Sequence, residues 1–248
     1  MRKFFLFLTA LTLLAVPAVA DGLTDQQKAE IGPLIREYLL ANPEVVKEAM
    51  DALERKQADA ESMQRTSALS ANATDIFHAQ GDLVAGNPEG SVTMVEFFDY
   101  NCGYCKRAFP DVMKMLQTDK DLRLVMKEFP ILGPGSTYAA RAALASRKQG
   151  KYWDYHLALL SHEGHIDEAV VDEIARTAGL DVDRLKNDMN DADVSAVIEA
   201  NMKLAQALTI QGTPAFIIDQ TLIPGAVGFD ALAMTVKQVR DQGGCKLC

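Results

Sequence analysis

Two cysteines separated by two residues lie in the segment EFFDYNCGYCKRAFP, residues 96 to 110, between an apolar run and a predicted helix. Three chemistries fit this spacing: a redox-active dithiol, half of a metal site, or a short structural disulfide. Cys102 comes at the predicted start of the helix, where free backbone N–H groups and the helix dipole stabilise an anion. We therefore expect a lowered pKa for the Cys102 thiol. Cys105 lies one turn further on the same side, where it can close a disulfide with Cys102, so a redox pair is the favoured interpretation.

A metal site is the weaker alternative, because zinc would need two further ligands near the pair. The segment HEGH, from His162 to His165, has a suitable spacing but falls in a glycine-containing stretch between predicted helices, which favours a solvated loop. His78 and His156 have no partner in the sequence and are expected to be structural. We predict no resident metal and no cofactor.

A second pair, Cys245 and Cys248, follows two glycines in the sequence GGCKLC. We expect this tail to hang free of the fold, as chain ends often do. A disulfide of the frayed tail, an accessory redox pair and a soft-metal ligand all remain open for it.

The first twenty residues, MRKFFLFLTALTLLAVPAVA, predict a secretory signal peptide. Arg2 and Lys3 precede an apolar core, and a small-residue cleavage pattern ends at Ala20. Their removal makes the formal net charge of -9 still more negative by two, which disfavours nucleic acid or an anionic membrane surface as a partner. We expect export to an oxidising compartment, namely the bacterial periplasm.

The elements that must position the first cysteine pair follow from hydrophobic periodicity. Residues 92 to 98 form a nearly continuous apolar run, which indicates a buried strand, and residues 122 to 129 are predicted to be a second buried strand. The helix between them implies a parallel pair. Helical spacing then fills residues 135 to 208, before a hairpin at residues 215 to 223 and a final helix. The predicted fold class is α/β, a small mixed sheet interrupted by an inserted helical subdomain.

Two amphipathic helices are predicted ahead of this domain. Thr24 and Gln27 form a capping box, Pro33 is expected to kink or start the first helix, and Asn42-Pro43-Glu44 starts the second. The polar stretch from 55 to 72 is expected to be a helix tail that runs into a linker. The apolar stripes need a partner surface, either the main domain or another copy of the chain, and self-association is favoured. The residues expected in that interface are Ile31, Leu34, Ile35, Leu39, Val46 and Met50.

The apolar strand, CGYC, Pro110 and the later Gly212-Thr213-Pro214 together resemble the thioredoxin superfamily, and the long helical insertion resembles its DsbA-like branch. The helical extension is similar to that of exported proteins of the suppressor-of-copper-sensitivity and Com1-like types. The resemblance implies a thioredoxin fold. The expected organisation is a signal peptide at 1–20, a helical oligomerisation segment and linker at 21–72, and the DsbA-like domain at 73–248.

The resemblance also implies roles for single residues. Cys102 would be the nucleophile and Cys105 the resolving thiol, while Glu96 matches the family's buried acid that assists proton transfer. Pro214 matches the family's cis-proline, and with Thr213 and Tyr104 it would bind substrate. DsbA-type oxidases place a histidine between the cysteines, whereas Gly103-Tyr104 and the threonine before the proline resemble disulfide isomerases such as DsbC.

The predicted function is an exported thiol-disulfide oxidoreductase that isomerises or forms disulfide bonds in periplasmic proteins. Its expected partners are cysteine-containing exported proteins, a membrane redox partner that resets the dithiol, and further copies of itself in a homodimer or homotrimer. The alternative is a periplasmic copper-handling module that uses the same thiolates. Glu96 and Pro214 favour the enzyme, since capture of a metal needs neither a proton acceptor nor a peptide-docking strand.

Overall fold

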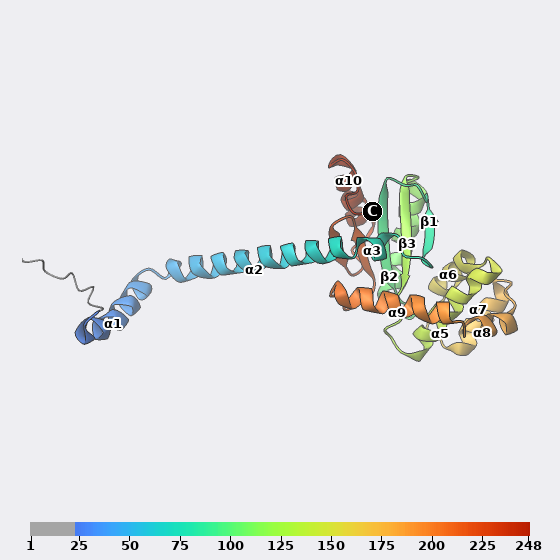
Figure 1. The fold of residues 1–248 in the computed structure, drawn as a ribbon, viewed down its shortest axis with the longest axis horizontal. Coiled ribbons are helices and arrows are strands. Elements are labelled where there is room, and N and C mark those ends of the chain that lie inside the picture. Colours follow the sequence, from blue (N-terminus) through green and yellow to red (C-terminus); the bar gives the residue numbers. More distant parts are fainter. Residues whose placement is uncertain (1–22) are drawn as a thin grey trace, which may run out of the picture. The chain divides into compact units, whose positions relative to one another are not determined.

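The structure is a computed structural model that describes residues 23–248, so the predicted signal peptide lies outside the described residues. The chain divides into two compact units, one ending at Asp59 and the other spanning Ala60–Cys248 (Figure 1). The helices are α1 Asp25–Ala41, α2 Glu44–Ala71, α3 Ala73–Phe77, α4 Gly103–Thr118, α5 Pro134–Ala145, α6 Tyr152–Ser161, α7 Glu168–Thr177, α8 Val182–Asp188, α9 Ala192–Ala207 and α10 Phe229–Asp241, with a short 3-10 helix at Ser146–Gln149. The strands are β1 Leu83–Gly86, β2 Val92–Phe98, β3 Leu122–Glu128, β4 Ala215–Ile218 and β5 Thr221–Pro224. Within residues 23–248, no helix combines the length and the apolar character needed to cross a membrane.

The first helix begins at the predicted capping box. Thr24 Oγ1 accepts the N–H of Gln27 at 3.2 Å, and Gln27 Oε1 accepts the N–H of Thr24 at 2.9 Å. Pro33 lies inside α1, so the helix does not start there. No residue of α1 is buried, and its apolar side chains Leu34 and Ile35 are 66% and 52% exposed in the single chain.

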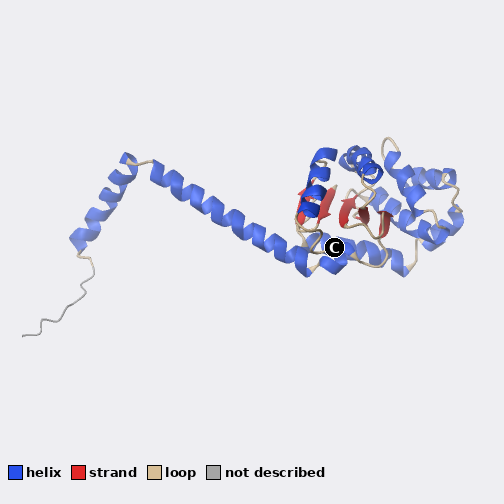
Figure 2. Cartoon of the chain, turned by 90° about the horizontal axis from the view of Figure 1, so that it is seen from above, coloured by secondary structure: helices blue, strands red, loops and turns tan. Residues whose placement is uncertain are grey.

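The sheet of the second unit has the order β1-β3-β2-β4-β5. Strands β2 and β3 are parallel, and β4 and β5 form an antiparallel hairpin, which confirms both pairings expected from the sequence. The edge strand β1 and the short helix α3 were not predicted from the sequence. Figure 2 shows the strands, in red, with helices on both sides.

Side-chain alternation along β2 divides the core into two clusters. Met94 and Phe98 face the cluster that includes α4, α10 and the inserted helices, whereas Val95 and Phe97 face the other. The second cluster also contains Leu69, which is 1% exposed. The end of α2 is therefore part of this core, and the linker expected before residue 72 is wrong: the helix continues to Ala71.

Helices α5 to α9 lie between β3 and β4 in the chain, as the predicted insertion requires. The side of α5 that packs inward is built of alanines, including Ala139, Ala142 and Ala143, which allow close approach of the neighbouring helices. These observations establish a mixed α/β thioredoxin-like arrangement with inserted helices and an amino-terminal helical segment.

The carboxyl-terminal tail does not hang free, so that expectation is wrong. Asp219, at the turn after β4, accepts the N–H groups of Lys246 and Leu247 through Oδ1 at 2.8 and 2.9 Å. Cys245 and Cys248 form a disulfide, and each packs against one of the two apolar clusters. Two backbone hydrogen bonds to one buried carboxylate hold the tail on the domain.

Candidate active site

Cys102 is the N-cap residue of α4, four residues after the end of β2. Its Sγ accepts the backbone N–H of Cys105 at 3.4 Å, which is the place of a capping side chain on the first turn of a helix. Both cysteines are free thiols, and Cys102 is 5% exposed while Cys105 is completely buried. Cys102 is therefore the more exposed of the two thiols.

The two thiols have opposite electrostatics. Hydrogen bonding from the Cys105 side chain is the largest influence on Cys102 and, with the N–H of Cys105, lowers its pKa to about 5 against the effect of burial. Burial raises the pKa of Cys105 far above its usual value, and the hydrogen bond to Cys102 and the charge of Glu96 act in the same direction. One sulfur is thus a thiolate at neutral pH and the other is a protonated donor to it.

Glu96 is 2% exposed in the middle of β2 and lies between Met94 and Phe98 on the same face. Met94 and Phe98 belong to the same core cluster as Cys105 of α4, so the carboxyl group of Glu96 lies on the side of the sheet that carries the dithiol. Burial, and next the charge of Cys102, raise the pKa of Glu96 to about 8. A carboxyl group that titrates near neutrality beside a buried thiol is suited to exchange a proton with it.

The Thr213–Pro214 peptide bond is cis, and the Thr213 carbonyl oxygen lies 3.1 Å from the Sγ of Cys102. The segment around this bond lines a surface depression of about 460 Å³, which also includes Tyr104. Tyr104 is 60% exposed, and the guanidinium of Arg107 lies 4.0 Å from the centre of its ring. The structure brings together all six residues that the sequence singled out.

Asp99 is a positioning residue that the sequence analysis missed. Its carboxylate is 1% exposed and accepts the N–H of Asn101 at 2.7 Å and the hydroxyl of Ser136 at 2.7 Å. The other oxygen accepts the N–H groups of Ile131 and Leu132 at 2.8 and 3.0 Å. This carboxylate joins the loop before Cys102 to the segment after β3. The signal that could have identified Asp99 in the sequence is the polar segment DYN, residues 99 to 101, between an apolar strand and the cysteine.

Two more side chains tie the cysteine loop to the inserted helices. The Asn101 side chain donates to the carbonyl of Ile166 at 2.9 Å and accepts its N–H at 2.7 Å. The Nζ of Lys106, next to Cys105, donates to the carbonyls of His162 and Gly164 at 2.8 Å each. The HEGH loop therefore supports the active-site helix through its backbone.

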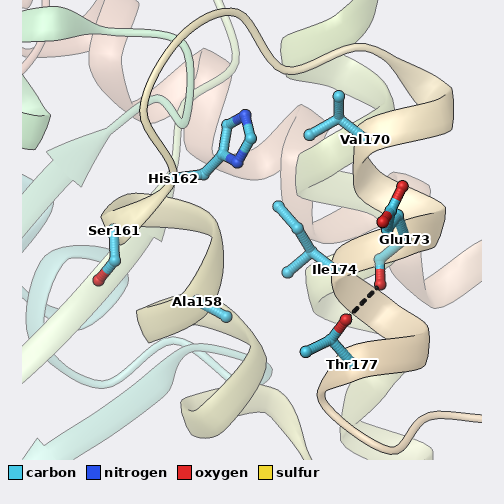
Figure 3. A pocket seen from close by; sticks show the side chains of 7 residues that line it. All are labelled: Ala158, Ser161, His162, Val170, Glu173, Ile174 and Thr177. Atoms are coloured by element: carbon cyan, nitrogen blue, oxygen red, sulfur yellow. Dashed lines mark hydrogen bonds between the residues drawn. The ribbon is translucent and has the colours of Figure 1, made fainter.

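The histidines of that loop do not form a metal site with the cysteines. His162 lines a groove of about 500 Å³ between α6 and α7, together with Val170 and Ile174 (Figure 3). His165 is exposed. Over residues 23–248, no group of three or more His, Cys, Asp or Glu side chains is placed to hold a metal ion.

We expect the thiolate of Cys102 to titrate with a midpoint near pH 5, because hydrogen bonds to the sulfur favour its charged form. The rate of alkylation of Cys102 should then be constant above this pH and fall about tenfold per pH unit below it. Ultraviolet absorbance of the thiolate measures the midpoint, and mass spectrometry after alkylation measures the rate. A matched Glu96→Gln variant should keep this midpoint, since Glu96 is protonated at pH 5, and a midpoint above pH 8 would contradict the assignment.

Comparisons with known proteins agree with this geometry. Residues 93–237 match the family described as DSBA-like thioredoxin domain, and residues 27–60 match the copper resistance protein ScsC N-terminal domain. The crystal structure of a thioredoxin-like oxidoreductase from Silicibacter pomeroyi DSS-3 is 47% identical, with a TM-score of 0.67, over 68% of this chain and 97% of that one. Proteus mirabilis ScsC in a transitional conformation is 29% identical, with a TM-score of 0.66, over 89% and 98% of the two chains.

Two further matches extend the comparison. A periplasmic thioredoxin-like protein from Salmonella enterica serovar Typhimurium is 30% identical, with a TM-score of 0.60, over 66% of this chain and 93% of that one. Among curated relatives, the Na(+)/H(+) antiporter NhaA 1 of Salinispora arenicola is 32% identical over 157 residues, and this chain spans 24% of its length. The family match covers the strand, the cysteine pair and the cis-proline together. The chain therefore belongs to the DSBA-like thioredoxin-domain family of thiol-disulfide oxidoreductases and carries an ScsC-like amino-terminal domain.

Proposed function

We propose that this chain is an exported enzyme that isomerises or forms disulfide bonds in periplasmic proteins through Cys102 and Cys105. The observation that carries the proposal is the asymmetry of the two thiols, with a stabilised thiolate at Cys102 and a buried, protonated Cys105. Thiol-disulfide exchange needs this division, because the thiolate is the attacking species and the second thiol must wait until a mixed disulfide has formed.

In the proposed reaction, the Cys102 thiolate attacks one sulfur of a substrate disulfide and the other sulfur leaves as a thiolate. A substrate thiol can then attack the mixed disulfide and form a different bond, which is isomerisation. In the reductive direction, Cys105 loses its proton to Glu96 and its thiolate attacks the Cys102 sulfur, which closes the Cys102–Cys105 disulfide and releases the substrate thiolate. Oxidation of a substrate dithiol is the reverse sequence.

In this scheme, the charge on Cys102 determines at which step Glu96 can accept a proton. Burial and, second, the charge of the Cys102 thiolate raise the pKa of Glu96, and the repulsion by that charge vanishes when the sulfur enters a mixed disulfide. The carboxyl group then ionises more easily and can accept the Cys105 proton at the step where it is needed. Glu96→Gln should therefore slow the resolution of mixed disulfides and leave the initial attack by Cys102 unchanged, as stopped-flow kinetics with a fluorescent peptide disulfide can measure.

Substrate docking is assigned to the depression around Thr213 and Pro214. It lies beside the Cys102 sulfur and is lined mainly by apolar and backbone groups, with the exposed ring of Tyr104 at its edge. An extended substrate segment that enters this depression would bring its sulfur to Cys102 with few demands on its sequence.

Export and self-association complete the proposal. The signal-peptide pattern of residues 1–20 and the periplasmic relative from Salmonella support the periplasm as the compartment. A membrane redox partner would reset the dithiol after each turnover. The exposed apolar residues of α1 and of the first turns of α2, among them Leu34, Val46 and Met50, support a homodimer or homotrimer through the amino-terminal helices.

The reduction potential, measured together with refolding of a scrambled substrate, tests the proposed function. Because no histidine lies between the cysteines, we expect a potential between roughly -120 and -230 mV, weaker than the strongest oxidants. The mature chain should also restore activity to scrambled ribonuclease in a glutathione buffer. A potential near -270 mV with no refolding would instead indicate a dedicated reductant.

Copper handling is the second candidate, favoured by the match of residues 27–60 to the ScsC N-terminal domain. Cys102 and Cys105 could offer two soft sulfur ligands to Cu(I). Titration of the reduced chain with Cu(I) against a competing chelator tests this candidate. One Cu(I) bound tightly per chain, and lost in Cys102→Ser, would support it, whereas no binding would remove it.

A further inference from the structure

The second cysteine pair has no part in the proposed reaction, although it repeats the local geometry of the first. Cys245 Sγ accepts the N–H of Cys248 at 3.1 Å, just as Cys102 Sγ accepts the N–H of Cys105 at 3.4 Å. Cys245 and Cys248 are joined as a disulfide and both are partly exposed. A thiol from outside can therefore reach this bond.

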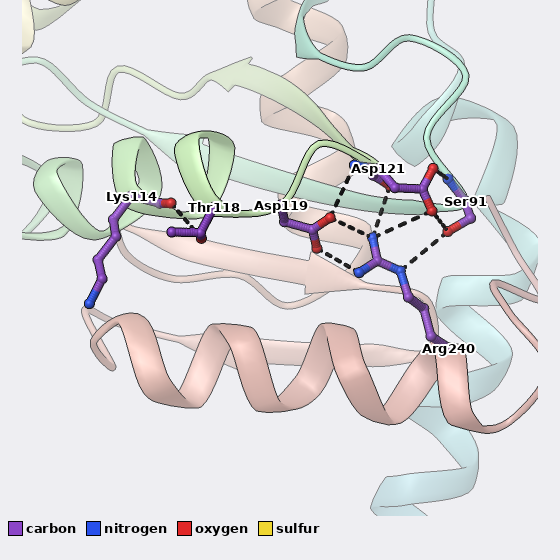
Figure 4. A network of polar contacts seen from close by, with 6 residues as sticks. All are labelled: Ser91, Lys114, Thr118, Asp119, Asp121 and Arg240. Atoms are coloured by element: carbon purple, nitrogen blue, oxygen red, sulfur yellow. Dashed lines mark hydrogen bonds and ion pairs between the residues drawn. The ribbon is translucent and has the colours of Figure 1, made fainter.

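The tail pair lies at the opposite end of β2 from Cys102. Arg240, near the end of α10, donates to the carboxylate of Asp119 at 2.7 and 2.9 Å and to the carbonyl of Asp121 at 2.9 Å, which fixes that end beside the start of β3 (Figure 4). The Sγ of Cys248 lies 4.0 Å from the carbonyl of Thr93, the second residue of β2. Cys102 lies four residues beyond Phe98, the last residue of the same strand.

The length of β2 separates the two pairs within one chain. The five steps along the strand from Thr93 to Phe98 rise about 17 Å at about 3.3 Å per residue. Cys248 lies four residues beyond Gly244, whose N–H donates to the carbonyl of Val239 at 3.0 Å and anchors the base of the tail. The tail disulfide therefore cannot exchange with Cys102 of its own chain, and any exchange must be with another molecule.

Asp219 provides a site that suits both oxidation states of the pair. Its carboxylate, in a residue only 7% exposed, accepts the N–H groups of Lys246 and Leu247 and lies 3.5 Å from the Sγ of Cys245. When the disulfide opens, the Cys245 thiol can donate a hydrogen bond to this oxygen. The tail can stay docked as a dithiol, and the disulfide can open without unfolding its surroundings.

A purely structural role explains this pair poorly. The bond joins residues three apart in the sequence, so it removes little conformational entropy from the unfolded chain. It connects no two elements, because both cysteines follow the last helix. The backbone hydrogen bonds to Asp219 already hold the tail in place.

We propose that Cys245–Cys248 is a second thiol-disulfide site that accepts two electrons from the reduced Cys102/Cys105 dithiol of another copy of this chain, which rests on the exchange chemistry of the proposed function. The donor Cys102 thiolate attacks Cys248 Sγ, and the Cys245–Cys248 bond breaks. Cys245 leaves as a thiolate held by the Cys248 N–H, takes a proton and donates it in a hydrogen bond to Asp219. The donor Cys105 thiolate then attacks Cys102, and Cys248 leaves with a proton. One disulfide forms in the donor and one opens in the acceptor. Two electrons pass to the acceptor, whose two thiols take one proton from the donor Cys105 thiol and one from solvent.

Two mature full-length variants separate donor from acceptor. The donor is reduced Cys245→Ser/Cys248→Ser, and the acceptor is oxidised Cys102→Ser/Cys105→Ser. They are mixed in equal amounts without oxygen, quenched in acid, alkylated and weighed by mass spectrometry. In at least a tenth of the chains, we expect the donor to carry two alkyl groups fewer, and the acceptor two alkyl groups more, than before mixing.

The same donor is assayed in parallel on scrambled ribonuclease. If it refolds ribonuclease but leaves the tail oxidised for hours, while dithiothreitol reduces that tail, the inference is overturned and the proposed function stands. If the donor fails on both substrates, the proposed function and the inference fail together.

Asp219→Asn adds an independent measurement. The amide oxygen can still accept the two backbone N–H groups, but the negative charge that disfavours a neighbouring thiolate is lost. Cys245 in the reduced tail should therefore be alkylated faster at pH 7, by at least threefold, than in the wild type. Asp241→Asn, the same change at an exposed position on α10, is the matched control and should have no effect. Equal rates in all three proteins would overturn the role given to Asp219.

Discussion

Cys102→Ser should reduce thiol-disulfide exchange by about 10³-fold or more, because a serine hydroxyl stays protonated where the cysteine is a thiolate. Cys105→Ser should instead leave a nucleophile that attacks substrates and then remains bound to them. Exchange is measured with a fluorescent peptide disulfide, and trapped complexes are separated by non-reducing electrophoresis and identified by mass.

The two serine variants control for each other, since each replaces one sulfur atom of the same turn by oxygen. Their melting temperatures should be similar in the reduced state, which would exclude unfolding as the cause of lost activity. Complexes trapped by Cys102→Ser rather than by Cys105→Ser would reverse the roles assigned to the two cysteines. The pKa of Cys102 is lowered and that of Cys105 is raised, so we expect Cys102 to be the attacking sulfur and Cys105→Ser to be the variant that traps complexes.

Deletion of residues 21–59 should convert an oligomer into a monomer that still oxidises dithiols but no longer isomerises disulfides. Isomerisation requires a misfolded substrate to be held while bonds are broken and remade, which several catalytic domains facing one space do better than one. Burial of the exposed stripes of α1 and α2 favours association at about 25 cal/mol per Å². Light scattering gives the mass, and refolding of scrambled ribonuclease gives the isomerase activity.

The truncation ends at Asp59 for a structural reason. The compact catalytic unit starts at Ala60, and Leu69 belongs to its core, so a cut placed at the sequence-predicted linker would remove a buried side chain. The full-length double variant Leu34→Glu/Met50→Glu should have the same effect as the deletion. Glu37→Gln, a change at an exposed polar position of α1, should leave the mass unchanged. A monomeric mass for the wild-type mature chain at micromolar concentration would refute self-association and favour a monomeric oxidase.

The sequence alone determined the central features of the catalytic domain. Runs rich in apolar residues identified β2 and β3, because a strand covered on both faces places most of its side chains in the core, and helical spacing identified the insertion. The local signals at Thr24 and Cys102 were also sufficient, since a cap depends only on the residues within one turn. The position of Glu96 six residues before Cys102 pointed to the buried acid through family resemblance.

The tertiary structure decided the features that depend on contacts distant in the sequence. Asp99 acquires its role from N–H groups about thirty residues away, and no local pattern shows where a buried carboxylate finds its donors. Leu69 is buried although its helix is polar, because the second cluster covers only the end of α2. The tail was expected to be free because its glycines favour flexibility, yet Asp219 holds it through the backbone N–H groups of the tail. Every residue except proline has such an N–H group, so the residue types of the tail do not show which acceptor these groups will find.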